Sequence, residues 1–143
     1  MSERTQQLYE LCQRAEKKGR IVIIGHDRAD VDSAAACVLM NRLLERWEIA
    51  SHIVLHEPDK QSRRVMARFD VDVSALEGET KDTDFLILVD HHQSAHPGSV
   101  LACIDHHPTE YPPEFPYVQI EDCGACAVMV LPGLWNKYIF KSS

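Results

Sequence analysis

The sequence is poor in positive charge. Its 143 residues contain 15 Lys and Arg against 22 Asp and Glu, which gives a formal net charge of -7. Proteins that bind duplex nucleic acid neutralise many phosphates with Lys and Arg, so this composition argues against a duplex-binding surface. Small anionic substrates are not excluded, because bound metal ions can supply positive charge locally.

Long apolar runs are also missing. No stretch approaches the ~20 consecutive apolar residues that a membrane-spanning helix needs, and the first residues, MSERTQQLYE, lack the apolar segment of a signal peptide. The five cysteines are an odd number, and several fall in apolar or helical patterns. This usage favours reduced thiols over a disulfide framework, so we expect a cytoplasmic protein without a membrane partner.

Two hydrophobic periods alternate along the chain. Apolar residues at helical spacing predict helices over residues 4–18, 31–47 and 59–69, and a further helix starting near residue 123. Apolar and β-branched runs predict buried strands at Ile21–Ile24, His52–Leu55, Phe85–Val89, Val100–Ile104 and Tyr117–Ile120. This alternation predicts the α/β class, with an open parallel sheet flanked by helices. We divide the chain into an N-terminal helix within 1–20, a main domain at 21–131 and an irregular tail at 132–143.

Histidine is plentiful, with eight residues, and most of it lies near predicted strand ends. Three apolar strands run directly into polar segments: Gly25-His26, Asp90-His91-His92 and Asp105-His106-His107. Ligands of open parallel sheets bind outside the carboxyl ends of the strands. We therefore expect these three segments to form one cluster.

The segment His26-Asp27-Arg28-Ala29-Asp30-Val31-Asp32 suggests metal chemistry. Side chains two residues apart point away from each other, so Asp30 and Asp32 suit two different metal ions better than one. Asp90, at the end of a neighbouring strand, could bridge the two ions, and His106 could complete the second. Imidazole and carboxylate ligands without a thiolate suit Mn²⁺, with Mg²⁺ or Co²⁺ as alternatives.

Two such ions about 3.5–4 Å apart can hold a hydroxide and a phosphoryl oxygen together, as the hydrolysis of a phosphate ester or anhydride requires. A single aspartate at a strand end is more often a helix cap, and Asp30 taken alone would be interpreted in that way. Three polar strand ends in one chain are much harder to explain as caps.

These segments resemble those of the DHH phosphoesterase superfamily. The matching motifs are GHDRADVDS (25–33), LVDHH (88–92), IDHH (104–107) and, more weakly, DCGACAVMV (122–130), in the family's order and covering most of the chain. Two branches of the superfamily compete. The manganese-dependent family II inorganic pyrophosphatases share Asp30-Val31-Asp32-Ser33 and Asp90-His91. The other branch cleaves short oligonucleotides, cyclic-dinucleotide products or 3'-phosphoadenosine phosphate, and often has an N-terminal helix and a Pro after DHH, as at Pro108.

The resemblance also implies roles for individual residues. It gives the metal ligands as His26, Asp30, Asp32, Asp90 and His106, the set that the spacing already suggested. It implies that His107 contacts the substrate phosphate and can act as a general acid. Asp105 would orient the neighbouring histidine.

The chain departs from the family pattern in two places. The usual Pro before the first Asp of the motif is Ala29 here. The family also places a further metal-binding Asp after the fourth motif and then a basic C-terminal cap domain, whereas no Asp follows Asp122. We expect the cap domain to be absent from this chain.

Two functions therefore stay open. One is a metal-dependent hydrolase that acts on pyrophosphate, a dinucleotide or phosphoadenosine phosphate, and a homodimer is a possible state of it. The other is a non-catalytic module that binds metal or nucleotide and needs a partner or a further domain.

Overall fold

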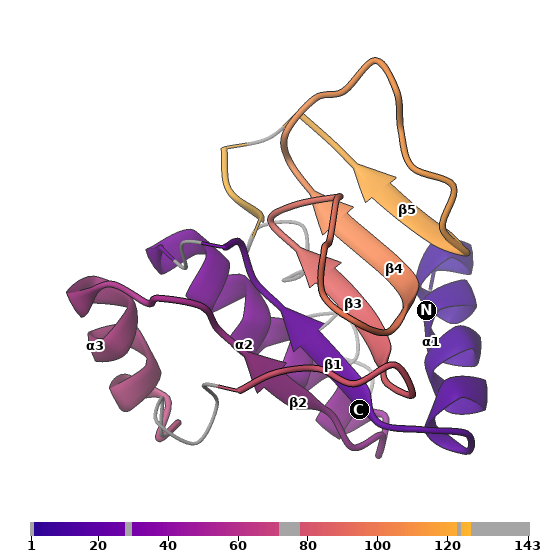
Figure 1. Cartoon of the computed structure of the whole chain (residues 1–143), viewed down its shortest axis with the longest axis horizontal. Helices are drawn as coiled ribbons and strands as arrows, with labels where there is room; N and C mark the ends of the chain where they lie inside the picture. Colours follow the sequence, from indigo (N-terminus) through magenta and orange to yellow (C-terminus); the bar gives the residue numbers. More distant parts are fainter. Residues whose placement is uncertain (1, 28–29, 72–77, 123, 127–143) are drawn as a thin grey trace.

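The computed structural model describes residues 2–27, 30–71, 78–122 and 124–126. One five-stranded sheet, with every neighbouring pair parallel, lies at its centre in the order β2-β1-β3-β4-β5 (Figure 1). The strands are β1 (Ile21–Ile24), β2 (His52–Val54), β3 (Phe85–Val89), β4 (Ser99–Asp105) and β5 (Tyr117–Ile120). The helices are α1 (Glu3–Glu16), α2 (Val31–Arg46) and α3 (Lys60–Arg68). The predicted fold class is confirmed.

The observed element ends lie within two residues of the predicted ones, and capping side chains mark the starts of two helices. The Asp30 carboxylate accepts from the Ser33 backbone N–H at 2.9 Å, and α2 starts at the next residue. Asp59 caps α3 in the same way, accepting from the Ser62 N–H at 2.7 Å. These caps satisfy backbone donors that have no partner inside the helix. The helix predicted from residue 123 and the domain boundary at 131 lie outside the described residues.

The core occupies both faces of the sheet because the strands are apolar on both sides. On one face, Ile23 and Ile87 pack with residues of α1 and α2, such as Cys12 and Met40. On the other face, a second cluster is formed by Val22, Ile24, Val54, Leu86, Leu88 and Cys103, with Phe115 from the β4–β5 loop packed against it. Strands buried on both faces are typical of parallel sheets and explain the continuous apolar runs in the sequence.

The described cysteines are buried free thiols: Cys12, Cys37, Cys103 and Cys126. Burial, helped by the nearby Glu16 charge, raises the pKa of Cys12 to about 12. Such a thiol stays protonated and unreactive, as expected for a packing residue. The described part of the chain also contains no helix long and apolar enough to span a bilayer.

The strand order changes direction at one place. From β1 the chain moves outward to β2 through α2, then returns across the sheet to β3, β4 and β5. The carboxyl ends of β1 and β3 therefore flank the point where the order reverses, which is where open α/β sheets bind their ligands.

A β-bulge sets the final register between β3 and β4. Leu86 pairs with Val100 but Ile87 pairs with Ala102, so Leu101 is an extra residue on β4. Beyond the bulge Val89 pairs with Ile104, and the Asp90 N–H donates to the Ile104 carbonyl at 2.9 Å. Asp90 and Asp105 are consequently adjacent residues at the ends of neighbouring strands.

Candidate functional site

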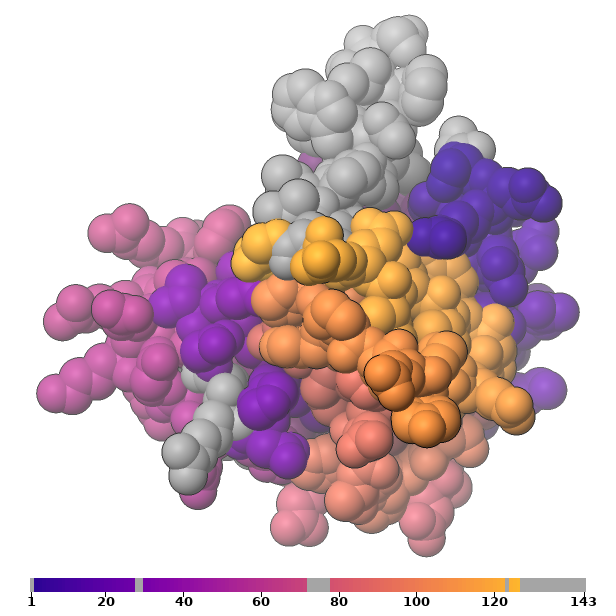
Figure 2. Space-filling model, turned by 90° about the horizontal axis from the view of Figure 1, so that it is seen from above, coloured from indigo at the N-terminus to yellow at the C-terminus, as the bar shows by residue number. Residues whose placement is uncertain are grey.

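A pocket of about 320 Å³ opens at the strand ends on both sides of this reversal. Its lining combines the residues that follow β1, β3 and β4: His26, Asp27, Asp90, His91, His92, Gln93, Asp105 and His107. Seen from above, the purple segment after β1 adjoins the orange segment after β4 (Figure 2). The three polar segments of the sequence thus meet at one place.

Close packing brings the start of α2 to the end of β1. A Cβ on Gly25 would lie only 2.6 Å from the Ser33 hydroxyl oxygen, so a larger residue would push the helix away. The His26 backbone N–H donates to the same hydroxyl at 2.7 Å. These contacts place the side chains of the first turn of α2 beside the strand ends.

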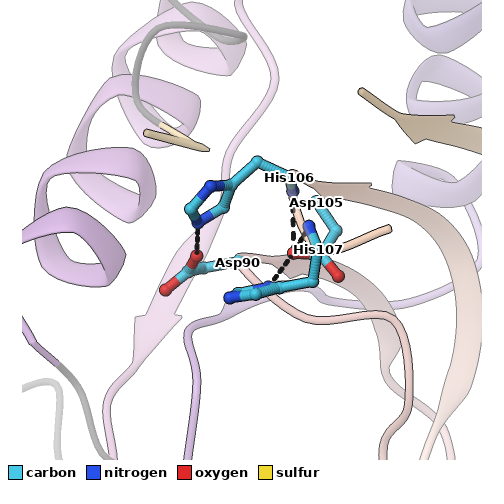
Figure 3. Close-up of side chains that lie close together, drawn as sticks. All are labelled: Asp90, Asp105, His106 and His107. Carbon is cyan, nitrogen blue, oxygen red and sulfur yellow. Dashed lines mark hydrogen bonds and ion pairs between the residues drawn. The ribbon is translucent and has the colours of Figure 1, made fainter. Parts of the chain in front are cut away.

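The first part of the site is the Asp90 group, which we define as Asp30, Asp32, Asp90 and His106. His106 Nε2 lies 2.8 Å from Asp90 Oδ1 and 3.3 Å from Asp32 Oδ2, so one imidazole joins carboxylates from β3 and α2 (Figure 3 shows its contact with Asp90). Asp32 Oδ2 also accepts from the Cys126 backbone N–H at 3.0 Å. The structure therefore brings two carboxylates to one histidine, and the charge of Asp30 also acts on Asp90.

Asp90 lies in an unfavourable environment for a negative charge. Burial and then the charges of Asp32 and Asp30 raise the pKa of Asp90 to about 6, although His106 opposes the shift. The residue also has a φ of 65°, a left-handed conformation that costs energy for a side chain other than glycine. Strain and charge repulsion at one buried carboxylate are typical of a site shaped for a cation.

The second part is the Asp105 group, defined as Asp105, His92 and His107. Asp105 is fully buried, and its two oxygens lie 2.6 Å from His107 Nδ1 and 2.6 Å from His92 Nδ1 (Figure 3 shows His107). The backbone N–H groups of His106 and His107 donate to the same carboxylate at 2.8 and 3.3 Å. Burial alone would raise the pKa of Asp105, but the hydrogen bonds from His92 and His107 outweigh it and hold the pKa below its usual value.

His26 and His91 also line the pocket. Their rings meet edge to face, with centroids 6.3 Å apart. His91 Nδ1 lies 2.9 Å from the Val89 carbonyl, and its buried Nε2 has no hydrogen-bond partner among the described residues. Burial lowers the pKa of His91, and the nearby His26 adds to the effect.

The residues present fit a divalent metal ion. Asp90, Asp105, His106 and His107 offer ligand atoms that all lie within 4.8 Å of one another. The Asp105 oxygens already accept several hydrogen bonds, so we regard Asp105 as an orienting group and Asp90 and His106 as the ligands of this set. A cation would also relieve the repulsion between Asp90, Asp32 and Asp30.

All seven residues singled out from the sequence lie at this edge of the sheet, although their individual roles stay predictions. Asp30 combines its place in the Asp90 group with the cap of α2. Sequence reasoning missed His92, whose bond to Asp105 mirrors that of His107. The repeated triplet Asp-His-His could have signalled it, since both triplets follow apolar strands.

A second histidine pair lies beside the pocket. The rings of His56 and His96 stack at 4.4 Å with an angle of 2°, and His96 Nε2 lies 3.5 Å from Asp27 Oδ1. His56 follows β2 and His96 precedes β4, so the stack connects two loops at the carboxyl edge.

The fold and the site together define an α/β domain with a carboxylate and histidine site at the carboxyl ends of its strands. The family model described as the DHH family, N-terminal domain, matches residues 20–140, and the chain belongs to this family. The resemblance inferred from the motifs is confirmed.

The fold is also similar to that of a solved exopolyphosphatase-related protein from Bacteroides fragilis, with a TM-score of 0.65 and 15% sequence identity. The similarity covers 92% of this chain and 44% of that chain, so this chain spans less than half the length of the solved one. No curated protein matches the chain.

Proposed function

We propose that this chain is the catalytic-type domain of a metal-dependent hydrolase that cleaves a phosphoester or phosphoanhydride bond in a small phosphorylated substrate. The single observation that carries the proposal is the Asp90 group. Asp90 is a buried carboxylate with a pKa of about 6, it feels the charges of Asp32 and Asp30, and it shares the His106 imidazole with Asp32. A bound cation would relieve the charge repulsion within this group. The chain has a net charge of -7, so a phosphate substrate also needs positive charge from bound cations.

The metal ligands of this proposal are His26, Asp30, Asp32, Asp90 and His106, arranged as two sites that share Asp90. When bound, divalent ions supply positive charge for the phosphoryl oxygens and lower the pKa of a bound water. We propose Mn²⁺ as the native ion, because imidazole and carboxylate ligands suit it. Mg²⁺ and Co²⁺ are the alternatives.

The chain's own groups perform the remaining tasks in this proposal. Asp105 orients His107 by accepting its Nδ1–H, which leaves the opposite nitrogen of the ring for the substrate. The side chain of His107 is half exposed at the pocket. This exposure lets it contact a phosphate and deliver a proton to a leaving oxygen. His91, His26 and Asp27 complete the lining of the pocket beside these groups.

A hydrolysis screen tests the proposal. The purified chain is incubated with Mn²⁺ and separately with pyrophosphate, dinucleotides and 3'-phosphoadenosine phosphate, and the products are quantified. We expect metal-dependent cleavage of at least one substrate, a loss of about 100-fold or more in Asp90→Asn, and loss in His107→Ala. Asp82→Asn, at an exposed aspartate before β3, is the matched control and should keep full activity.

A binding module without turnover is the second candidate. The match to only 44% of the solved exopolyphosphatase-related chain favours it, since the activity of a protein of that length need not belong to this part alone. The same preparations distinguish the two candidates. The binding module is supported if calorimetry detects Mn²⁺ binding that is lost in Asp90→Asn, while none of the three substrates is cleaved. Absence of both binding and cleavage would contradict both candidates.

A further inference from the structure

Asp105 holds two imidazoles in equivalent ways, and only one of them has a role so far. His107 Nδ1 and His92 Nδ1 each lie 2.6 Å from a different oxygen of the same carboxylate. The two histidines come from different strand ends, β4 and β3, and both line the pocket. Geometry that orients His107 toward the pocket therefore applies to His92 as well.

The hydrogen bond fixes which nitrogen of His92 is left for other contacts. Asp105 accepts the backbone N–H groups of His106 and His107, as a carboxylate does, and its second oxygen accepts the Nδ1–H of His92. The second ring nitrogen, Nε2, points away from Asp105 since the two nitrogens lie on different edges of the imidazole. His92 keeps 19% of its side chain exposed, although Asp105 beneath it is fully buried.

We propose that His92 is a second substrate-contacting histidine, and that His92 and His107, held by the shared carboxylate of Asp105, form a two-imidazole site for one phosphate group. Each Nε2 shares one proton with a phosphate oxygen, and the proton can come from either partner. This inference rests on the proposed function, to which it adds a place for a phosphate group beside the metal ligands.

A purely structural role for His92 is the competing explanation. A structural histidine would be expected to satisfy both nitrogens within the protein, as buried polar groups usually do. His107 and the two backbone N–H groups all contact Asp105 Oδ1, and His92 Nδ1 is the partner of Oδ2, so this bond does help to hold the carboxylate. That bond uses only one of the two ring nitrogens of His92. The exposure of His92 at the pocket favours a contact with a ligand.

Binding of inorganic phosphate to the full chain in the presence of Mg²⁺ tests the proposal without depending on turnover. Long-range ¹H–¹⁵N spectra of the histidine side chains report each Nε2 and Nδ1 separately. We expect phosphate to shift the Nε2 resonances of both His92 and His107, while their Nδ1 resonances keep the signature of the bond to Asp105. A shift of His107 alone would overturn the proposal.

A pair of variants separates the proposed contact from the structural one. In His92→Asn the amide can reproduce the Nδ1–H donor to Asp105 but has no atom at the position of Nε2, so we expect phosphate affinity to fall about tenfold or more. His52→Gln, at an exposed histidine on β2, is the control and should bind phosphate as the parent does. Equal affinity of His92→Asn and the parent would overturn the proposal.

These results are independent of the hydrolysis screen. Cleavage of a substrate together with an unmoved His92 would refute the two-imidazole site and leave the proposed function standing. Phosphate shifts at both histidines without cleavage would support the two-imidazole site and refute hydrolysis by this chain.

Discussion

The ends of β3 and β4 carry the same three residue types in the same order, Asp-His-His, on neighbouring strands. Their aspartates nevertheless behave in opposite ways. Asp90 faces carboxylates and has a raised pKa of about 6, whereas Asp105 faces imidazoles and backbone N–H groups and has a lowered pKa. Both are almost completely buried, so exposure does not explain the difference.

The comparison shows that the partners of a buried aspartate decide its role. Asp105 already has the hydrogen bonds that stabilise its charge, so it can hold other side chains in place but gains little from a metal ion. Asp90 has one imidazole and two repelling carboxylates, so it gains much from one. We therefore interpret Asp105 as an orienting residue and Asp90 as a ligand, a distinction with measurable consequences.

The largest expected effect is on stability in the absence of metal. Asp105→Ala removes the acceptor of two imidazole and two backbone N–H groups and should lower the free energy of unfolding by about 3–5 kcal/mol. Asp90→Ala removes a repelled charge and should cost far less. Urea denaturation at pH 8 with EDTA measures both. Equal losses at the two sites would contradict the distinction.

Metal binding should show the reverse order. At a Mn²⁺ concentration about 100 times its dissociation constant, the parent chain should gain roughly 2.7 kcal/mol of stability by mass action. Asp90→Asn should abolish this gain, because the proposal assigns Asp90 to both ions. Asp105→Asn should retain it with an affinity reduced about 10- to 100-fold, as for a residue that orients a ligand. Thermal melts over a series of Mn²⁺ concentrations provide the measurement.

The pH dependence of stability should differ in sign between the two aspartates. The pKa of Asp90 is higher in the folded protein, about 6, than its ordinary value of 3.8, so folding favours the protonated form. Its stabilising contribution is therefore complete below about pH 4 and is lost as the pH rises through about 6, by roughly 3 kcal/mol in total. Metal-free Asp90→Asn should lack this loss in urea titrations between pH 4 and 7.

Asp105 should behave in the opposite direction. Because its folded pKa is lowered, its contribution is present above about pH 4 and disappears as the pH falls through the folded pKa. Asp105→Asn should accordingly differ most from the parent near neutral pH and least in acid. If the stability difference between each Asn variant and the parent stays constant across this pH range, the two aspartates do not have opposite pKa shifts.

The smallest effect concerns an ion pair without burial. Arg4 and Glu121 lie 3.0 Å apart, but their side chains are 55% and 49% exposed. Solvent screens such a pair, so Arg4→Ala should change the free energy of unfolding by less than about 0.5 kcal/mol. A larger loss would mean that ion pairing contributes to the free energy of unfolding without burial, and that burial does not explain the contribution of the Asp105 group. The same urea denaturation series measures it.

Much of the fold could be predicted from the sequence because its signals are local. The apolar runs IVII and FLILV can only be buried strands or short buried helices, and their length and β-branching favour strands. Asp30 is a residue type common at helix N-caps, and the structure shows it capping α2. The positions of Asp90 and Asp105 at strand ends follow from the same runs, so the place of the site was also predictable.

For His92 the repeated triplet indicates a place at a strand end, but nothing in the local sequence indicates its contact with Asp105, 13 positions away. The opposite pKa shifts of Asp90 and Asp105 were equally inaccessible. They depend on which side chains from α2 and the neighbouring strand come close, and the two triplets have the same residue types.

The sequence by itself determined the α/β class, the apolar strands and the presence of His and Asp at three strand ends. Hydrophobic period and residue chemistry are properties of short segments, so the chain alone was sufficient for them. Only the tertiary structure decided which carboxylate became the repelled one. The extra residue Leu101 shifts the register of β4 so that Asp105 lies beside Asp90. The packing of α2 against Gly25 brings Asp32 to His106. Electrostatics depends on distances between segments far apart in the chain, and folding alone sets those distances.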